Sequence, residues 1–317
     1  EGMRYGLSEL GHLAGFVPVD SAYDEEAVYP GHKAPIGVFV GPLNRSEMMT
    51  GIGWHEQRLV LLPANSTWIP EGLVRALEKV VTGFLAPSHW AADILRGYTH
   101  LPVTVWRHGV LPTFRPDALD QIALVKDYDN GEFRVGHLAS THLQRKGTRE
   151  LVRGWCQAVL EGGLGLKPLL TLVVDGPHDI FQKDAEEASD RNPHVLDTIV
   201  WSRRRWNMDA AQAAHWYRKQ HLIAQPSRGE GFGMVPLEAR ACGVPVLMTS
   251  CTGHSETFGI ADAPSGEKGL SNAKRGVIGV ATYEDASIDD GPGALAPSLS
   301  EDVVMNSLIG AYQYWGV

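Results

Sequence analysis

Residues 225–246 read Gln-Pro-Ser-Arg-Gly-Glu-Gly-Phe-Gly-Met-Val-Pro-Leu-Glu-Ala-Arg-Ala-Cys-Gly-Val-Pro-Val. An apolar strand ends at Gln225, a glycine-rich loop follows, and a helix opens near Met234 before another strand begins. Glycines at a helix start let backbone N–H groups approach an anion, and the helix dipole adds to the attraction. Glu230 and Glu238 lie eight positions apart, and carboxylates accept hydrogen bonds from hydroxyl groups. The stretch predicts a binding site for a ligand that carries both an anion and hydroxyls.

Short apolar strands alternate with amphipathic helices on both sides of this stretch. The strands are bounded by Gly, Pro or Asn, and the helices have apolar residues at three- to four-residue spacing. Such alternation is typical of parallel sheets covered by helices. The expected strands are 35–41, 58–62, 80–85, 103–106, 132–138, 169–174, 195–201, 221–225 and 244–249. The expected helices are 70–79, 90–97 with Ser88 as its cap, 148–160, 208–220, 234–242 and 301–314.

Length and punctuation predict two α/β domains, because 317 residues exceed the roughly 150 of an average domain. We expect an N-terminal Rossmann-like domain over 1–115, a linker over 116–131 and a second Rossmann-like domain over 132–300. A C-terminal helix over 301–317 is expected to pack back on the N-terminal domain. Ligands of open parallel sheets bind at the carboxyl ends of the strands. The site is therefore expected in a cleft between the two domains.

Composition excludes several classes of protein. The sequence has no apolar run of about 18 residues, so we expect no membrane partner. The N-terminus lacks a basic and then apolar leader, and Cys156, Cys242 and Cys251 lie far apart, which argues against zinc clusters and disulfides. We therefore expect a cytoplasmic protein. A net charge of −9 also argues against a general nucleic-acid coat protein.

The central stretch resembles the retaining glycosyltransferases of family four, also called group one, which have the GT-B fold. Their motif PS-x-x-EGFG-x-x-x-LEA-x-A-x-G-x-PV matches residues 226–246. The resemblance covers residues 80–257 and implies two Rossmann-like domains that face a cleft, with a first domain shorter than is usual for the family. Further segments that look like family motifs are 86–90, 107–116, 145–147, 175–177 and 252–256.

The resemblance implies a role for each motif residue. Glu230 would contact the hydroxyls of the transferred sugar, Glu238 would bind the nucleotide ribose, and Lys146 would neutralise the departing diphosphate. Backbone N–H groups of Gly231, Phe232 and Gly233 would face the sugar and diphosphate. The family's reaction needs no metal and no cofactor. The expected substrate is a nucleotide sugar such as a UDP-sugar, and the expected enzyme is a metal-independent hexosyl- or pentosyltransferase.

Several positions depart from the family pattern and leave alternatives open. The family's usual arginine after the preceding strand is replaced by His137, which either binds the donor or is a strand-end histidine bonded to a carbonyl. Arg145 is the candidate substitute for that arginine. His55 follows a pair of glycines and is either a cleft residue that contacts the sugar or acceptor, or a surface histidine. His254 is expected in a loop that faces the cleft. The pair Asp127 and Asp129 imitates a metal-binding DxD, but its place in the linker argues against a metal site.

The acceptor is inferred from a weaker resemblance. Residues 287–298 look like those of compact phage-encoded family members, some of which act on hydroxymethylated DNA bases. The basic run 203–205, followed by Trp206, could track phosphates. The favoured acceptor is therefore 5-hydroxymethylpyrimidine in DNA, with action in the host cytoplasm if the protein is phage-encoded. The alternatives are a glycan, protein or small-molecule acceptor, an inactive module that binds a nucleotide sugar, and an epimerase of GT-B fold.

Overall fold

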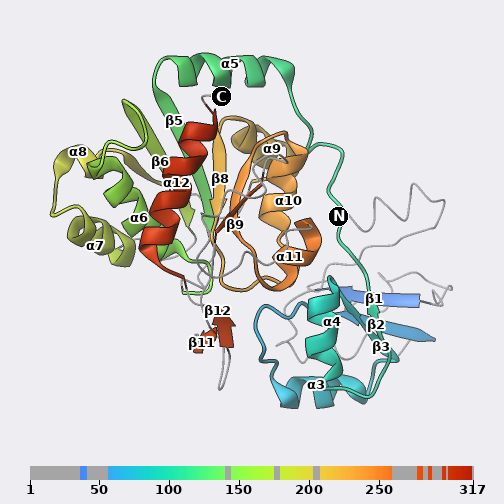
Figure 1. Ribbon diagram of the computed structural model, residues 1–317. Coiled ribbons are helices and arrows are strands. Elements are labelled where there is room, and N and C mark those ends of the chain that lie inside the picture. Colours follow the sequence, from blue (N-terminus) through green and yellow to red (C-terminus); the bar gives the residue numbers. More distant parts are fainter. Residues whose placement is uncertain are drawn as a thin grey trace.

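The computed structural model describes residues 36–40, 56–139, 144–174, 179–202, 208–258, 277–280, 285–287, 295–297 and 299–315. Over these ranges the chain forms two separate parallel sheets, each with its own helices (Figure 1). The prediction of two α/β domains with parallel sheets is confirmed. Predictions that concern His55, 175–177 and 203–206 lie outside the described residues, as does most of 287–298.

The first sheet has strand order β1-β2-β3-β4 in the described residues, and all its pairings are parallel. Two helices accompany it, and their apolar faces pack on the sheet around Val74, Phe84 and Leu95. The Ser88 side chain accepts a hydrogen bond from Ala91 N, which confirms its predicted capping role. The elements are β1 (Ile36–Val40), β2 (Gln57–Leu61), α3 (Glu71–Glu78), β3 (Gly83–Ala86), α4 (His89–Arg96) and β4 (Val103–Val105).

The second sheet has strand order β10-β9-β8-β5-β6-β7 in the described residues. Its strands are β5 (Glu132–Ala139), β6 (Lys167–Val174), β7 (Ile199–Ser202), β8 (Leu222–Gln225), β9 (Val246–Thr249) and β10 (Val277–Val280). The chain runs outward from β5 on one side and from β8 on the other, and β5 pairs with β8. This reversal of strand order opens a crevice at the carboxyl ends of β5 and β8, where parallel sheets bind ligands.

Helices cover both faces of the second sheet. One face packs on α6 (Thr148–Leu160), α7 (Asp179–Ala188), α8 (Pro193–Leu196) and α12 (Glu301–Trp315), around the fully buried Trp155. The other face packs on α9 (Ala210–Arg218) and α10 (Met234–Ala241). The remaining elements are α5 (Ala118–Asp129), α11 (Thr252–Phe258) and the antiparallel pair β11 (Asp285–Ser287) and β12 (Leu295–Pro297). No described helix is both long and apolar enough to cross a membrane.

The C-terminal helix α12 packs on the second domain, so the expectation that it returns to the first domain is wrong. It lies against α6 (Figure 1), where Gly154 permits close approach because a Cβ there would lie 2.8 Å from Glu301 O. Tyr128 Oη donates to Tyr312 O at 2.9 Å, and Trp315 Nε1 donates to His221 O at 2.8 Å. Burial of Val304 and Leu308 in the second core accounts for this placement.

Two other expectations need correction. Residues 195–201 were expected to be one strand, but α8 ends at Leu196 and β7 begins at Ile199. The segment 116–131, expected as a linker, contains α5, whose N-cap Asp117 accepts hydrogen bonds from Leu119 N and Asp120 N. Asp120 in turn pairs with Arg218, the last residue of α9, and with Lys219, its C-cap. The helix is thereby tied to the second domain.

Candidate functional site

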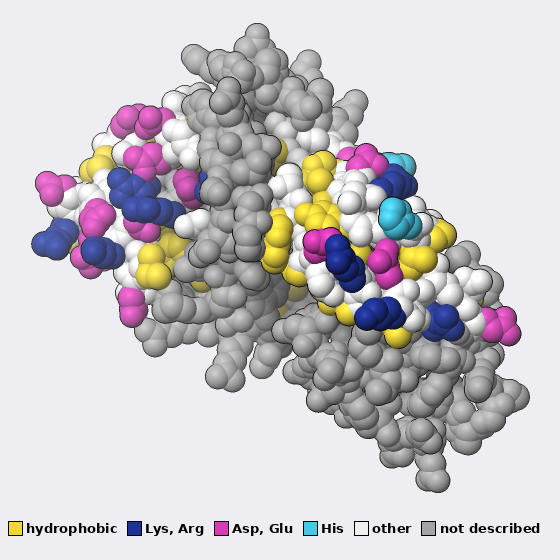
Figure 2. Space-filling view, turned by 90° about the horizontal axis from the view of Figure 1, so that it is seen from below, with side chains coloured by type: hydrophobic (Ala, Val, Ile, Leu, Met, Phe, Trp, Pro, Cys, Tyr) yellow, Lys and Arg dark blue, Asp and Glu magenta, His cyan; other side chains and the backbone are white. Residues whose placement is uncertain are grey.

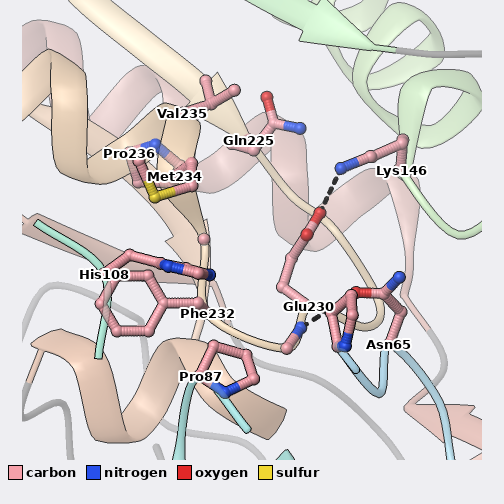
Figure 3. A pocket seen from close by; sticks show the side chains of 13 residues that line it. Asn65, Pro87, His108, Lys146, Gln225, Glu230, Phe232, Met234, Val235 and Pro236 are labelled. Atoms are coloured by element: carbon pink, nitrogen blue, oxygen red, sulfur yellow. Dashed lines mark hydrogen bonds and ion pairs between the residues drawn. The ribbon is translucent and has the colours of Figure 1, made fainter. Parts of the chain in front are cut away.

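A pocket of about 260 Å³ lies where the two domains meet (Figure 3). The first domain contributes the loops after its strands, and the second contributes the loop between β8 and α10 together with the start of α10. One part of the wall is polar and the other is apolar. The lining residues are Pro63, Asn65, Pro87, His108, Lys146, Gln225, Glu230, Gly231, Phe232, Gly233, Met234, Val235 and Pro236. The predicted cleft position at the carboxyl ends of the strands thus contains a pocket.

An ion pair between Lys146 and Glu230 forms the polar part of this pocket (Figure 3). Lys146 precedes α6, and its Nζ donates to Glu230 Oε1. The two side chains are each only 13% exposed. Arg145 Nη1 lies 3.4 Å from the same carboxylate oxygen. Burial by itself would raise the pKa of Glu230, but Lys146 and Arg145 outweigh it and lower that pKa to about 2. The pocket therefore presents a carboxylate that is paired with Lys146 in the lining and with Arg145 behind it.

Glycines in the loop between β8 and α10 allow backbone atoms of the first domain to pack closely against this loop. A Cβ at Gly229 would lie 2.0 Å from Asn65 O, and one at Gly231 would lie 2.8 Å from Ala64 O. Gly233 has φ +93° and caps α10 without a side chain. In the first turn the N–H groups of Met234 and Val235 have no intrahelical partner, and Pro236 has no N–H. The atoms that approach Gly229 and Gly231 most closely belong to the first domain. Gly231 N donates to Asn65 Oδ1 and is therefore not free to face a sugar or diphosphate as expected, while the same role for Phe232 and Gly233 stays a prediction.

Hydrogen bonds from both domains hold the loop that carries Glu230. Gly231 N donates to Asn65 Oδ1 at 3.1 Å, and Ser88 Oγ donates to Gly231 O at 2.6 Å. From the other side, Glu230 N donates to Thr252 Oγ1 at 3.1 Å. Asn65 and Ser88 belong to the first domain, so the position of Glu230 depends on contact between the domains. Sequence reasoning missed Asn65 because a single asparagine after a strand has no distinctive pattern.

Glu256 forms a second link between the domains. Its Oε2 accepts from His89 N at 2.6 Å at the start of α4, and its Oε1 accepts from Arg107 Nη2 at 2.9 Å. A carboxylate at a helix N-terminus is favourable because it meets unsatisfied N–H groups. The 252–256 segment was expected to be a loop that faces the cleft, and it forms most of α11 instead. Its glutamate connects the two domains beside the pocket.

His137 is not available to a ligand, which corrects its expected role in donor binding. The side chain is fully buried, and Nδ1 donates to Ala224 O at 2.7 Å. Since this leaves Nε2 unprotonated in the neutral ring, Nε2 accepts from Thr148 Oγ1 at 2.9 Å. Burial lowers the pKa of His137 to about 4. The structure supports the alternative of a strand-end histidine bonded to a carbonyl.

Arg145 and His254 lie behind the pocket wall rather than on it. Arg145 is 7% exposed, and its Nη1 donates to Gly229 O at 2.7 Å. His254 is fully buried beneath the loop, where its Nε2 would lie 2.7 Å from a Cβ on Gly233. Burial lowers the pKa of His254 to about 4, although the nearby Glu230 carboxylate acts in the opposite direction. Both residues can support Glu230, and neither lines the pocket.

Glu238 lies on α10 and not among the residues that line the pocket. Its Oε2 accepts a hydrogen bond from Tyr217 Oη at 2.9 Å. Burial raises the pKa of Glu238, partly offset by this hydrogen bond. The structure therefore brings Lys146 to Glu230, and it brings Phe232 and Gly233 into the lining, but it places Glu238 against Tyr217.

The candidate metal motif is engaged in an ion pair. Asp127 pairs with Arg134, so its carboxylate has a cationic partner already. Within the described ranges, no group of three or more His, Cys, Asp or Glu side chains could hold a metal ion.

Comparison with known proteins identifies the second domain. Residues 132–272 match the family model described as "Glycosyl transferases group 1". Over this range the second domain is similar to the glycosyl transferases of group 1. This range holds β5 to β9 together with Lys146, Glu230 and Glu238. The sequence resemblance to this family is therefore confirmed, whereas a phage-type origin stays a prediction.

Two curated relatives and one solved structure show the extent of the similarity. The chain is 33% identical over 123 residues to the lipopolysaccharide core biosynthesis mannosyltransferase LpsB of Rhizobium meliloti (strain 1021), covering 39% of this chain and 32% of that protein. It is 30% identical over 178 residues to a D-inositol 3-phosphate glycosyltransferase of Arthrobacter sp. (strain FB24), covering 54% and 38%. The chain thus spans about a third of the length of these relatives.

The solved structure is the pneumococcal O-GlcNAc transferase GtfA in complex with UDP and GlcNAc. It has a TM-score of 0.52 at 14% identity and covers 84% of this chain and 46% of that chain. Similarity at this level extends across both parallel sheets and concerns the fold alone. The predicted GT-B architecture is confirmed.

The buried histidines of the second domain make its stability depend on pH. His137 and His254 have a pKa of about 4 when folded and about 6.5 when unfolded. Because the unfolded state binds protons first as the pH falls, stability present above pH 6.5 is lost between about pH 6.5 and 4. The expected loss is about 3 kcal/mol for each histidine.

Denaturant unfolding at pH 7, 6, 5 and 4 measures this loss. The raised pKa of Glu150 and Glu238 acts in the opposite direction, so a His137→Gln variant isolates the histidine contribution by its shallower profile. NMR should show two imidazoles still neutral at pH 5. A wild-type profile no steeper than that of the variant would contradict the buried, neutral state of His137.

Proposed function

We propose that the chain is a retaining glycosyltransferase that moves a sugar from a nucleoside diphosphate sugar to a hydroxyl group of an acceptor. The observation that carries this proposal is the buried Lys146–Glu230 pair in the pocket between the domains, beside the N-terminus of α10. The pair lies within the matched range 132–272, and it joins a cation suited to phosphate with a carboxylate suited to hydroxyls. Both properties match the two halves of a nucleotide sugar.

In the proposed site the diphosphate and the sugar of the donor bind to different groups of the protein. The diphosphate lies at the free N–H groups of α10 and beside Lys146, because both attract an anion. Glu230, held as a carboxylate by Lys146 and Arg145, accepts hydrogen bonds from hydroxyls of the transferred sugar. As the glycosidic bond breaks, negative charge grows on the leaving diphosphate, and Lys146 stabilises that charge. The same diphosphate then takes the acceptor's proton on the face from which it departs, so the sugar keeps its anomeric configuration.

We propose that Glu238 binds the ribose hydroxyls of the donor after exchanging its bond with Tyr217. Its change to Gln should raise the dissociation constant of a nucleoside diphosphate at least tenfold, since a charged acceptor contributes roughly 1.5–3 kcal/mol. Calorimetry measures this constant. Tyr217→Phe is the matched control: it removes the competing hydroxyl, so affinity should be kept or improved. An unchanged dissociation constant in Glu238→Gln would show that the Glu238 carboxylate bonds Tyr217 only and does not bind the nucleotide.

The names of similar proteins bear on donor and acceptor. A similar structure holds UDP, which favours a UDP-sugar donor here, and the relatives are named for a lipopolysaccharide core mannosyl transfer and for D-inositol 3-phosphate. These names favour the glycan or small-molecule acceptor. The DNA acceptor stays a prediction without support from them, and in the described part of the face in Figure 2 basic and acidic side chains are interspersed. Residues 203–205, on which the DNA hypothesis depends, lie outside the described residues.

A panel experiment tests the proposed function. The chain is incubated with UDP-, GDP- and ADP-sugars and with three acceptors: inositol phosphate, a lipopolysaccharide core oligosaccharide, and DNA with or without 5-hydroxymethylcytosine. We expect one acceptor to gain the mass of one sugar, equally with and without excess EDTA. Donor binding without any product would indicate an inactive module, and donor isomerisation without acceptor would indicate an epimerase. Activity abolished by EDTA and restored by Mg²⁺ or Mn²⁺ would contradict the metal-independent reaction.

A further inference from the structure

Gln225 is a buried amide on the polar side of the pocket. It is the last residue of β8, it is 1% exposed, and it belongs to the pocket lining. Figure 3 shows its side chain between Lys146 and Val235. Its position at the carboxyl end of a central strand is fixed by the β8 pairing with β9. The sheet thus fixes the backbone at Gln225, and the amide is buried rather than on the surface.

The amide has one satisfied atom and one unsatisfied atom. Gln225 Nε2 donates to Ser227 Oγ at 3.3 Å, whereas Oε1 has no hydrogen-bond partner among the described residues. A buried polar atom without a partner costs free energy, and each such atom in a folded protein needs an explanation. A ligand group that enters the pocket would supply the missing partner.

The chemistry of the amide selects the kind of ligand group. Oε1 only accepts, so a phosphate oxygen would be repelled by it, while a hydroxyl can donate to it. If the amide is turned over, Oε1 accepts from Ser227 Oγ and the free atom is the donor Nε2. A hydroxyl satisfies this orientation too, because it both donates and accepts. The neighbouring cation Lys146 already attracts the phosphate part of a ligand, which leaves the neutral amide for the hydroxyl part.

We propose that Gln225 is a specificity-determining residue that hydrogen-bonds a hydroxyl group of the bound nucleotide sugar. The inference rests on the proposed function and adds a residue to the donor site. It explains why an amide, rather than an apolar side chain, ends a buried strand. The unpaired amide lowers the stability of the empty protein and is satisfied when the donor binds.

The chain contains a matched control, Gln220, in the segment that precedes the same strand. Gln220 is 5% exposed, its Oε1 also lacks a partner, and its Nε2 donates to Trp216 O at 3.3 Å. It does not line the pocket. Gln220 and Gln225 therefore share residue type, burial and an unsatisfied oxygen, and they differ in access to the ligand.

Calorimetry with Gln225→Met and Gln220→Met tests the inference. Methionine keeps the length of the side chain and removes both amide atoms. We expect Gln225→Met to bind the nucleotide sugar at least tenfold more weakly, and Gln220→Met to bind within twofold of wild type. The melting temperature of unliganded Gln225→Met should equal or exceed that of wild type, which separates lost recognition from misfolding. Equal affinity of Gln225→Met and wild type would overturn the inference.

Deoxygenated donors identify the hydroxyl. A donor that lacks the hydroxyl bound by Gln225 should lose affinity for wild type and lose none for Gln225→Met, as expected in a double-mutant cycle. Titration with the parent nucleoside diphosphate, which lacks the sugar, shows which hydroxyl Gln225 binds. If Gln225 binds a sugar hydroxyl, Gln225→Met binds the nucleoside diphosphate as well as wild type does. If Gln225 binds a ribose hydroxyl, Gln225→Met binds it more weakly. Additive losses for every deoxygenated donor would reject the contact. Wild type that binds no nucleotide sugar at all would instead reject the proposed function.

Discussion

Replacement of Lys146 by Met is expected to reduce turnover of the nucleotide sugar by about 10²- to 10³-fold, the usual cost of removing one group that stabilises developing charge. The charge that Lys146 balances grows as the glycosidic bond breaks, so the loss should appear in kcat more than in KM. The rate is measured as transfer to the acceptor found by the panel, or as slow donor hydrolysis. Lys219→Met is the control, since Lys219 is also paired with a carboxylate, that of Asp120, but does not line the pocket.

Stability separates a catalytic role for Lys146 from a structural one. In Lys146→Met the buried Glu230 carboxylate keeps Arg145 as its cation, at 3.4 Å. We therefore expect a loss of unfolding free energy toward the lower end of the 3–5 kcal/mol that breaking a buried pair costs. Adding Glu230→Gln should restore stability without restoring turnover. Turnover that returns together with stability would show that Lys146 only neutralises Glu230.

Replacement of Gly229 by Ala is expected to disturb the contact between the domains. The new Cβ would lie 2.0 Å from Asn65 O, and a clash with backbone cannot be relieved by a change of rotamer. Overpacking of this kind costs about 1–3 kcal/mol. Because Asn65 also accepts from Gly231 N, displacement of the loop should move Glu230 and lower kcat/KM at least tenfold.

Gly72→Ala provides the control for this substitution. Gly72 lies in α3, and a Cβ there would meet nothing within 4 Å. Alanine should leave activity unchanged and keep or raise the unfolding free energy by up to about 1 kcal/mol. Denaturant unfolding and steady-state kinetics measure both variants. Normal stability and activity in Gly229→Ala would show that Asn65 and the loop do not touch in solution.

The sequence predicted those parts of the fold whose signals are local. Ser88 before an amphipathic helix, and apolar runs such as 169–174, needed only near neighbours for their interpretation. The prediction of a linker over 116–131 was wrong because the charged end of this segment resembles a connector. Asp117, which follows a proline, is nevertheless a helix-capping signal. The packing of α12 could not be predicted, because its apolar face around Val304 and Leu308 fits any apolar surface of the right shape.

The sequence predicted which residues carry the chemistry of the site better than it predicted where those residues lie. Lys146 and Glu230 were assigned from motifs, and the structure brings them together. His137 could not be judged from sequence, since its burial depends on Thr148 and on the carbonyl of Ala224. Asn65 carried no sequence signal, because its part in the site arises from contact between segments far apart in the chain.

A crystal structure of the chain with a nucleoside diphosphate sugar shows whether the pocket is the donor site. We expect the diphosphate at the N-terminus of α10 beside Lys146, with sugar hydroxyls facing Glu230 and a hydroxyl of the donor at Gln225, in the pocket between the two domains. A nucleotide bound away from this pocket, or a pocket left empty at millimolar donor, would contradict this expectation.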